Sequence, residues 1–88
     1  MSNFKLIDMF TTWCFPCKNM APIVEKIVAE FDNVQLIKID VEEDTDIAVK
    51  YGVRSVPTFI LLKDNQIVDR LVGAVPASEF KEFITKNM

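Results

Sequence analysis

The stretch Trp13-Cys14-Phe15-Pro16-Cys17-Lys18 contains both cysteines of the 88-residue chain, and their spacing is the strongest signal in the sequence. Two residues separate the cysteines, so on a helix they lie about one turn apart and can form a disulfide with each other. A ring this small restrains the unfolded chain only weakly, which makes a structural crosslink a poor explanation. The spacing is better suited to a disulfide that is made and broken.

The surroundings of the pair predict different tasks for its two members. A mostly apolar run over residues 4–10 predicts a buried strand, residues 11–14 a loop, and the apolar spacing that follows predicts a helix. Unpaired N–H groups and the macrodipole at the start of a helix stabilise a thiolate, which is the form that attacks disulfides. We therefore expect Cys14 to be the exposed nucleophile and Cys17 the less accessible thiol that resolves the mixed disulfide.

The alternative for a Cys-x-x-Cys pair is half of a zinc site. Structural zinc takes four ligands, and the chain has no further cysteine and no histidine. Such a site would need ligands from another chain, so we expect no metal. The missing histidine also excludes nucleophilic chemistry of the Cys–His type.

Asp8 is an acid inside the first apolar run, between Ile7 and Met9. Either it reaches solvent near the strand end, or it is a buried carboxylate with a raised pKa that exchanges a proton with the resolving thiol near neutral pH. Lys38 lies in the next apolar run. It either pairs with Asp8 and tunes that titration, or it is a surface lysine whose stem covers apolar neighbours.

Four apolar runs predict strands, and three stretches predict helices. The expected strands cover residues 4–10, 34–40, 58–62 and 66–72. The helices are expected to start near Pro16, at Asp44 or Asp46, and at Pro76. Lys63-Asp64-Asn65 predicts a hairpin between the last two strands. The order βαβαββα predicts an α/β fold in one domain over residues 1–88, a four-stranded mixed sheet flanked by three helices.

Composition argues against several classes of function. Half of the residues are hydrophobic and 26% are charged, as in ordinary globular domains. A net charge of −3 with scattered Lys and Arg argues against nucleic acid as a ligand. No apolar run approaches the roughly 20 residues that span a bilayer. Because no signal peptide is visible, we expect a cytoplasmic protein without membrane association.

The motif and its surroundings resemble the thioredoxin family. Residues 13–18, followed by Ala21-Pro22, are similar to that family's active-site signature, and Asp8 matches its buried acid. Residues 50–58 resemble the segment that leads into its cis-proline, and residues 72–74 resemble the glycine turn before its last helix. The similarity covers essentially the whole chain in the same order.

The resemblance implies a thioredoxin-like fold and a thiol–disulfide oxidoreductase that reduces disulfides in protein substrates. It implies Cys14 as the nucleophile, Cys17 as the resolving thiol, Asp8 as the proton acceptor and Lys38 as the electrostatic partner of Asp8, with the Val56–Pro57 bond in cis. The residues expected to contact the substrate are Trp13, Phe15, Pro16, Val56, Pro57, Gly73 and Ala74.

The same resemblance implies partners and an electron source. Disulfide-containing proteins would be the substrates, and electrons would come from NADPH through a flavin-dependent thioredoxin reductase. No cofactor would be bound, because the Cys14–Cys17 disulfide is itself the redox-active group. The protein is expected to act as a monomer.

Three features depart from the family pattern, and the most conservative is Phe10, which stands where the family often has a second tryptophan. The usual opening strand and helix are absent, so the chain is about the size of a glutaredoxin, and the strand that contains Leu36 is expected at an edge of the sheet. Phe15 replaces the usual glycine between the cysteines. A bulky ring at this position is expected to alter partner fit and redox poise.

Two other functions remain open on the sequence. The first is a glutathione-dependent, glutaredoxin-like oxidoreductase, suggested by the short length and by Val56-Pro57; Pro16 and Gly73-Ala74-Val75 argue against it, since glutaredoxins usually carry a tyrosine and a Gly-Gly-acidic turn there. The second is a redox-silent binding module that holds a partner in the groove, which would have no need of an intact cysteine pair.

Overall fold

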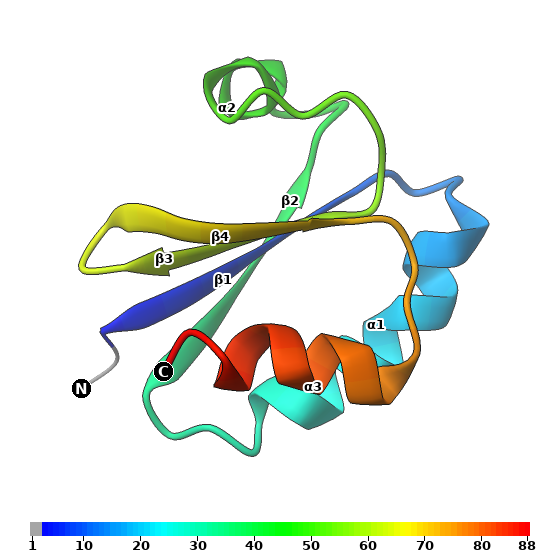
Figure 1. Cartoon of the computed structure of the whole chain (residues 1–88). Coiled ribbons are helices and arrows are strands. Elements are labelled where there is room, and N and C mark those ends of the chain that lie inside the picture. Colours follow the sequence, from blue (N-terminus) through cyan, green and yellow to red (C-terminus); the bar gives the residue numbers. More distant parts are fainter. Residues whose placement is uncertain (1–2) are drawn as a thin grey trace.

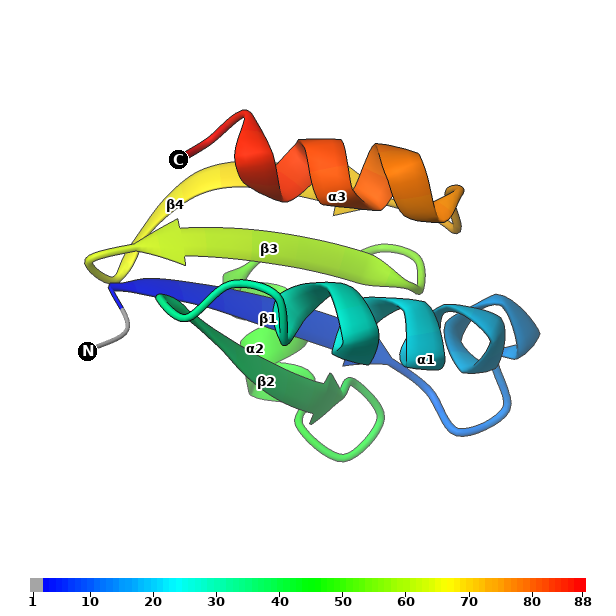
Figure 2. The ribbon, with the colours of Figure 1, turned by 90° about the horizontal axis from the view of Figure 1, so that it is seen from below.

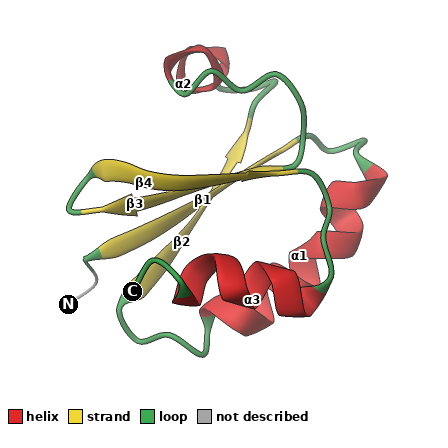
Figure 3. Cartoon of the chain, viewed as in Figure 1, coloured by secondary structure: helices red, strands yellow, loops and turns green. Residues whose placement is uncertain are grey.

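The computed structural model describes residues 3–88, and its elements follow the expected order βαβαββα (Figure 1). The strands are β1 (Phe4–Phe10), β2 (Val34–Asp40), β3 (Thr58–Lys63) and β4 (Gln66–Val72). The helices are α1 (Phe15–Val28), α2 (Thr45–Lys50) and α3 (Ala77–Thr85) (Figure 3). Within residues 3–88, no helix combines the length and the apolar character needed to cross a membrane.

The four strands form one mixed sheet in the order β2-β1-β3-β4. β1 runs parallel to β2 and antiparallel to β3, and β3 and β4 form an antiparallel hairpin. Helices α1 and α3 cover one face of the sheet, and α2 lies on the other face (Figure 2). The predicted fold class is therefore confirmed, and so is the position of Leu36, because its strand β2 is an edge strand.

The larger hydrophobic core lies between the sheet and the helix pair α1 and α3. Its fully buried side chains include Leu6, Val24, Phe59, Phe80 and Ile84. The rings of Phe59 and Phe80 meet edge to face with centroids 5.1 Å apart, which joins β3 to α3. A smaller core beneath α2 contains Ile7, Met9, Ile60 and Leu62.

The residues that begin the helices and form the hairpin turn mostly agree with the prediction from the sequence. Asp44 caps α2, because its Oδ1 accepts a hydrogen bond from the Ile47 N–H at 3.3 Å. Asn65 takes a positive φ of 68° in the hairpin turn. The expectation that Pro76 begins the last helix is off by one residue. Pro76 is the N-cap, with extended ψ of 155°, and helical geometry starts at Ala77.

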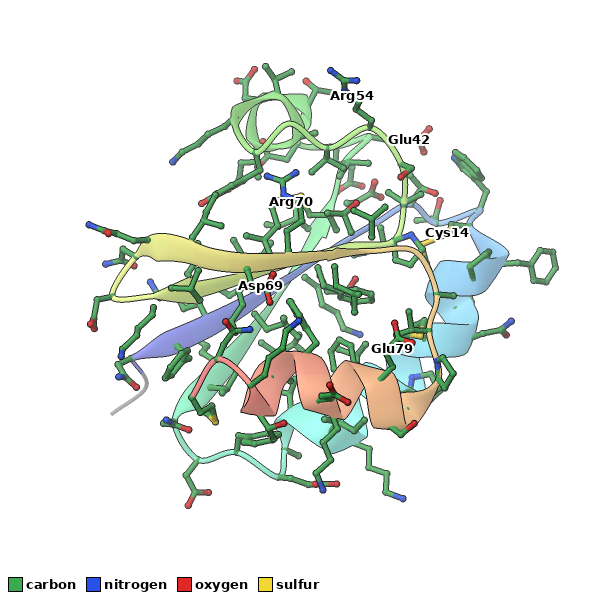
Figure 4. The ribbon with its side chains drawn as sticks, in the orientation of Figure 1. Cys14, Glu42, Arg54, Asp69, Arg70 and Glu79 are labelled. Carbon is green, nitrogen blue, oxygen red and sulfur yellow. A yellow bond between two sulfur atoms is a disulfide. The ribbon has the colours of Figure 1, made fainter. Side chains whose placement is uncertain are left out.

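Strand β4 contacts a helix on each face through two adjacent residues. Asp69 and Arg70 point to opposite sides of the strand (Figure 4). Asp69 accepts a hydrogen bond from Asn87 Nδ2 at 2.8 Å, which holds the end of the chain after α3, and this bond is the main cause of its lowered pKa. Arg70 donates to the carbonyl of Tyr51 at the end of α2. The edge strand thus anchors both helical layers.

Replacing Phe80 with alanine tests the link between α3 and the sheet. Phe80 is completely buried against Phe59, so Phe80→Ala should lower the free energy of unfolding by about 3–5 kcal/mol. Urea denaturation followed by circular dichroism measures the change. Phe15→Ala is the matched control: that ring is 76% exposed, so its loss should cost less than about 0.5 kcal/mol. Equal costs for the two variants would contradict this description of the core.

Candidate active site

The two cysteines lie at the junction between β1 and α1. Cys14 is the N-cap of α1, with extended backbone angles of φ −82° and ψ 109°, and Cys17 lies in the first turn. The two form a disulfide with their Cα atoms 5.3 Å apart. The Cys14 N–H donates to the Thr11 carbonyl at 3.4 Å, and this turn aims the chain into the helix.

The first turn of α1 places a hydrogen-bond donor on the Cys14 sulfur. The backbone N–H of Cys17 donates to Cys14 Sγ at 3.2 Å. Helix starts leave such N–H groups without backbone acceptors, and the helix macrodipole is positive at this end. Pro16, which has no N–H, stands in this first turn where no donor is lost. Both effects favour a negative charge on Cys14 once the disulfide is reduced.

The expected difference in exposure between the two cysteines is wrong for the disulfide form. Cys14 is 4% exposed and Cys17 is 8% exposed, so both are buried. The two sulfurs are bonded to each other in this form. What distinguishes the two residues is the surface to which each contributes. Cys14 lines an outer groove, and Cys17 lines an inner pocket.

The outer groove has a volume of about 690 Å³ and borders Cys14. Four of the residues expected to contact substrate line it, namely Trp13, Phe15, Pro16 and Val56. Trp13 and Phe15 are 65% and 76% exposed, which is unusual for large apolar side chains and typical of a contact surface. Trp13 is nevertheless held in place, because its Nε1 donates to Glu42 Oε1 at 2.9 Å.

The other three expected contact residues are Pro57, directly before β3, and Gly73 and Ala74, directly after β4. The Val56–Pro57 bond is cis, as expected, and Pro57 is buried. The N–H of Gly73, whose φ is +94°, donates to the Pro57 carbonyl at 2.8 Å. Pro57, Gly73 and Ala74 are not among the residues that line the groove. Their contact with substrate therefore stays a prediction.

Six further residues line the groove that the sequence did not single out as contacts: Thr11, Val41, Glu42, Val53, Arg54 and Ser55. Figure 4 shows Glu42 and Arg54 on the α2 side of Cys14. The sequence held one indication for three of these residues, because residues 53–55 directly precede Val56, an expected contact residue. The positions of Val41 and Glu42 depend on how the chain turns after β2, which no local pattern predicts.

The inner pocket, of about 280 Å³, brings Asp8, Lys38 and Cys17 together. Asp8 lies opposite Lys38 on β2 and opposite Phe59 on β3, and it is buried. The solvent-reaching alternative for Asp8 is therefore excluded. Phe10, Thr11, Thr12, Lys18 and Ala21 complete the lining.

Burial dominates the electrostatics of Asp8. Desolvation raises the pKa of its carboxyl from 3.8 to about 6; Lys38 lowers this pKa and Glu25 raises it, each by a smaller amount. The ammonium of Lys38 makes its ion pair with Glu25, at 3.1 Å, and the two side chains are partly exposed. Lys38 thus acts on Asp8 through its charge, without a salt bridge between them.

The arrangement supports thiol–disulfide exchange. Cys14 has a helix start that favours its thiolate, Cys17 is bonded to it, and a carboxyl that titrates near neutral pH lines the same pocket as Cys17. Among residues 3–88, no group of three or more His, Cys, Asp and Glu side chains is placed to hold a metal ion.

Comparison with known proteins gives one consistent family. The family model described as thioredoxin matches residues 1–86. Thioredoxins of Staphylococcus epidermidis and Staphylococcus aureus are each 40% identical over 88 residues, which covers 99% of this chain and 85% of theirs.

Solved structures agree with the sequence comparison. Fasciola hepatica thioredoxin superposes with a TM-score of 0.90 at 38% identity, covering 99% of this chain and 83% of its own. The thioredoxin NaTrxh of Nicotiana alata gives the same TM-score at 39% identity, covering 99% and 75%.

The cost of burying Asp8 should be visible in how the free energy of unfolding depends on pH. Between pH 3.8 and about 6 the folded state keeps a proton on Asp8 that the unfolded chain releases, so stability falls as pH rises through this window. Asp8→Asn removes the charge and keeps the shape. It should raise the free energy of unfolding by about 3 kcal/mol near pH 8 and by less than about 1 kcal/mol near pH 4.

Urea denaturation at the two pH values measures this difference. Asp32→Asn is the control, because Asp32 is exposed on the turn before β2 and its replacement should change stability by less than about 0.5 kcal/mol at either pH. A gain from Asp8→Asn that does not depend on pH, or a loss, would contradict the assignment of Asp8 as a buried, titrating acid.

Proposed function

This chain belongs to the thioredoxin family of thiol–disulfide oxidoreductases, and from this premise we propose the part that each residue takes in reducing protein disulfides. Residues 1–88 act as one thioredoxin-like domain. Cys14 is the nucleophile, Cys17 is the resolving thiol, Asp8 is the proton acceptor, and Lys38 tunes the charge on Asp8. The observation that carries the proposal is that the two cysteines have different surroundings. Cys14 Sγ accepts a hydrogen bond from the Cys17 N–H, and Cys14 lines the outer groove, whereas Cys17 lines the inner pocket with Asp8.

The first step forms the mixed disulfide. The Cys14 thiolate attacks one sulfur of a substrate disulfide, the substrate S–S bond breaks, and the other substrate sulfur leaves with the electron pair and takes up a proton. The N–H of Cys17 stabilises the attacking thiolate before the reaction. The exposed rings of Trp13 and Phe15 offer apolar area to the polypeptide around the substrate cysteine.

The second step releases the substrate. Cys17 loses its proton to the Asp8 carboxylate, and the resulting thiolate attacks Cys14 Sγ. The Cys14–Cys17 bond forms, the bond between Cys14 and the substrate breaks, and the second substrate sulfur leaves reduced. Asp8 suits this task because a pKa of about 6 leaves it mostly ionised, and still basic, at neutral pH. The two protein thiols end as the disulfide, so two electrons have passed to the substrate.

A reductase must return the protein to its dithiol form. We assign this role to a flavin-dependent thioredoxin reductase that takes electrons from NADPH, with no cofactor bound to the chain itself. The protein would act as a monomer in the cytoplasm. Identity of 40% to thioredoxins over 99% of this chain and 85% of theirs supports this donor over glutathione.

A coupled assay tests the proposed reaction and its donor. With NADPH and thioredoxin reductase, the protein should catalyse reduction of insulin disulfides, followed as loss of NADPH absorbance. Cys14→Ser should abolish turnover. Cys17→Ser should stop after one event and accumulate the Cys14–substrate mixed disulfide, which mass spectrometry identifies.

Two other outcomes would indicate the two alternative functions. NADPH consumption that requires glutathione and glutathione reductase, and that ignores thioredoxin reductase, would indicate a glutaredoxin-like enzyme. Full biological function in a strain whose only copy carries Cys14→Ser and Cys17→Ser would indicate a redox-silent binding module. Either result would overturn the proposal.

A further inference from the structure

Helix α2 leaves a pocket between itself and the sheet. Among residues 3–88, α2 is the only helix on its face of the sheet and has six residues, whereas α1 and α3 together cover the other face (Figure 2). The pocket has a volume of about 320 Å³ and is lined by residues of β1, β2, β3, α2 and the hairpin turn; we call it the α2 slot. Pockets of this size suit small ligands. None of its lining residues belongs to the outer groove or the inner pocket, so disulfide exchange does not explain it.

The walls of the α2 slot are aliphatic. Ile7 on β1 lies opposite Ile37 on β2, and both line the slot together with Ile39, Leu62 and, from α2, Ile47. Ile7 and Leu62 are buried, whereas the other three isoleucines are only partly buried. The short helix therefore leaves part of this apolar surface in contact with water. Such surface favours a ligand with a hydrocarbon group, because binding removes the apolar area of both from water.

The charged lining of the α2 slot is positive. Lys5 of β1 and Lys50 at the end of α2 line it, and no carboxylate of the described chain does. Lys5 Nζ donates to Asn65 Oδ1 at 3.0 Å, and Lys50 Nζ lies 5.4 Å from the centre of the Tyr51 ring. Neither lysine forms an ion pair with any of residues 3–88. Although the whole chain carries a net charge of −3, this slot is complementary to a ligand with an apolar body and a negative head.

We propose that the α2 slot binds a small amphiphilic carboxylate, of the kind represented by a medium-chain fatty acid. The hydrocarbon chain packs on Ile7 and Ile37 beneath Ile47, and the carboxylate lies near the ammonium groups of Lys5 and Lys50. The modest volume of the slot favours a single chain with a small headgroup over a larger lipid. Binding involves no covalent step and no cysteine, so this site is independent of the proposed function.

Titration of the protein with octanoate, followed by NMR of its isoleucine methyl groups, tests the proposal. Octanoate should shift the isoleucine methyls that line the slot, and the shifts should saturate with a Kd of about 1 mM or lower. Two further probes separate the contributions of the chain and the charge. Octylammonium, which has the same chain and the opposite charge, should bind at least about tenfold more weakly. Acetate, which lacks the chain, should give no saturating shift.

Two double variants test the part taken by the lysines. Lys5→Gln combined with Lys50→Gln should bind octanoate about fivefold more weakly, because both positive charges of the slot are lost. Lys26→Gln combined with Lys63→Gln is the matched control. It removes the same charge from two lysines that do not line the slot, and it should bind octanoate within about twofold of the wild type. Thermal melting followed by circular dichroism verifies that both variants are folded.

Three results would overturn the inference: octanoate shifts in the wild type that do not saturate or that lie outside the slot, equal affinities for octanoate and octylammonium, or equal losses in the two double variants. The first two comparisons use the wild type and need no variant to fold. Insulin reduction in the coupled assay is measured separately, so none of these results would refute the proposed function, and its failure would leave the α2 slot unaffected.

Discussion

The structure depends on one placement: Cys14, the residue that we propose as the nucleophile, is the N-cap of helix α1. Because Cys14 is the N-cap, its Sγ takes the hydrogen-bonding position that a serine or aspartate oxygen usually takes, and it accepts the N–H of Cys17 at 3.2 Å. The helix start is held by the core, since α1 buries Met20, Val24 and Ile27 against the sheet. Packing of α1 against the sheet thus holds the Cys17 N–H in place as a hydrogen-bond donor to Cys14 Sγ, where negative charge develops.

The second constraint is that the two cysteines have different surroundings although they are only three positions apart in the sequence. Cys14 borders a groove with exposed aromatic side chains, where a polypeptide can lie, whereas Cys17 borders a pocket with a buried carboxyl. That carboxyl destabilises the fold when ionised, which is the usual sign of a group retained for chemistry. In the proposed mechanism, this division keeps the proton transfer from Cys17 to Asp8 away from the groove that would hold the substrate.

Much of this could be predicted from the sequence, because the decisive signals are local. Apolar periodicity together with helix-start residues predicted the seven elements, and the position of Asp8 inside an apolar run left burial as one of two alternatives, of which the structure has the buried one. Contacts between segments that are distant in the sequence could not be predicted from these local patterns. The burial of Cys14 together with Cys17 in the disulfide form, and the pairing of Lys38 with Glu25, depend on how α1 packs against the sheet.

The acidity of Cys14 in the reduced protein tests the account most directly. The rate of alkylation by iodoacetamide, followed against pH in the Cys17→Ser variant, reports the thiolate of Cys14 alone, and the backbone N–H at position 17 remains. The hydrogen bond and the helix start predict a midpoint at least about one unit below the value of about 8.5 for a free cysteine. A midpoint at or above that value would show that the start of α1 does not activate this sulfur, and would contradict the account.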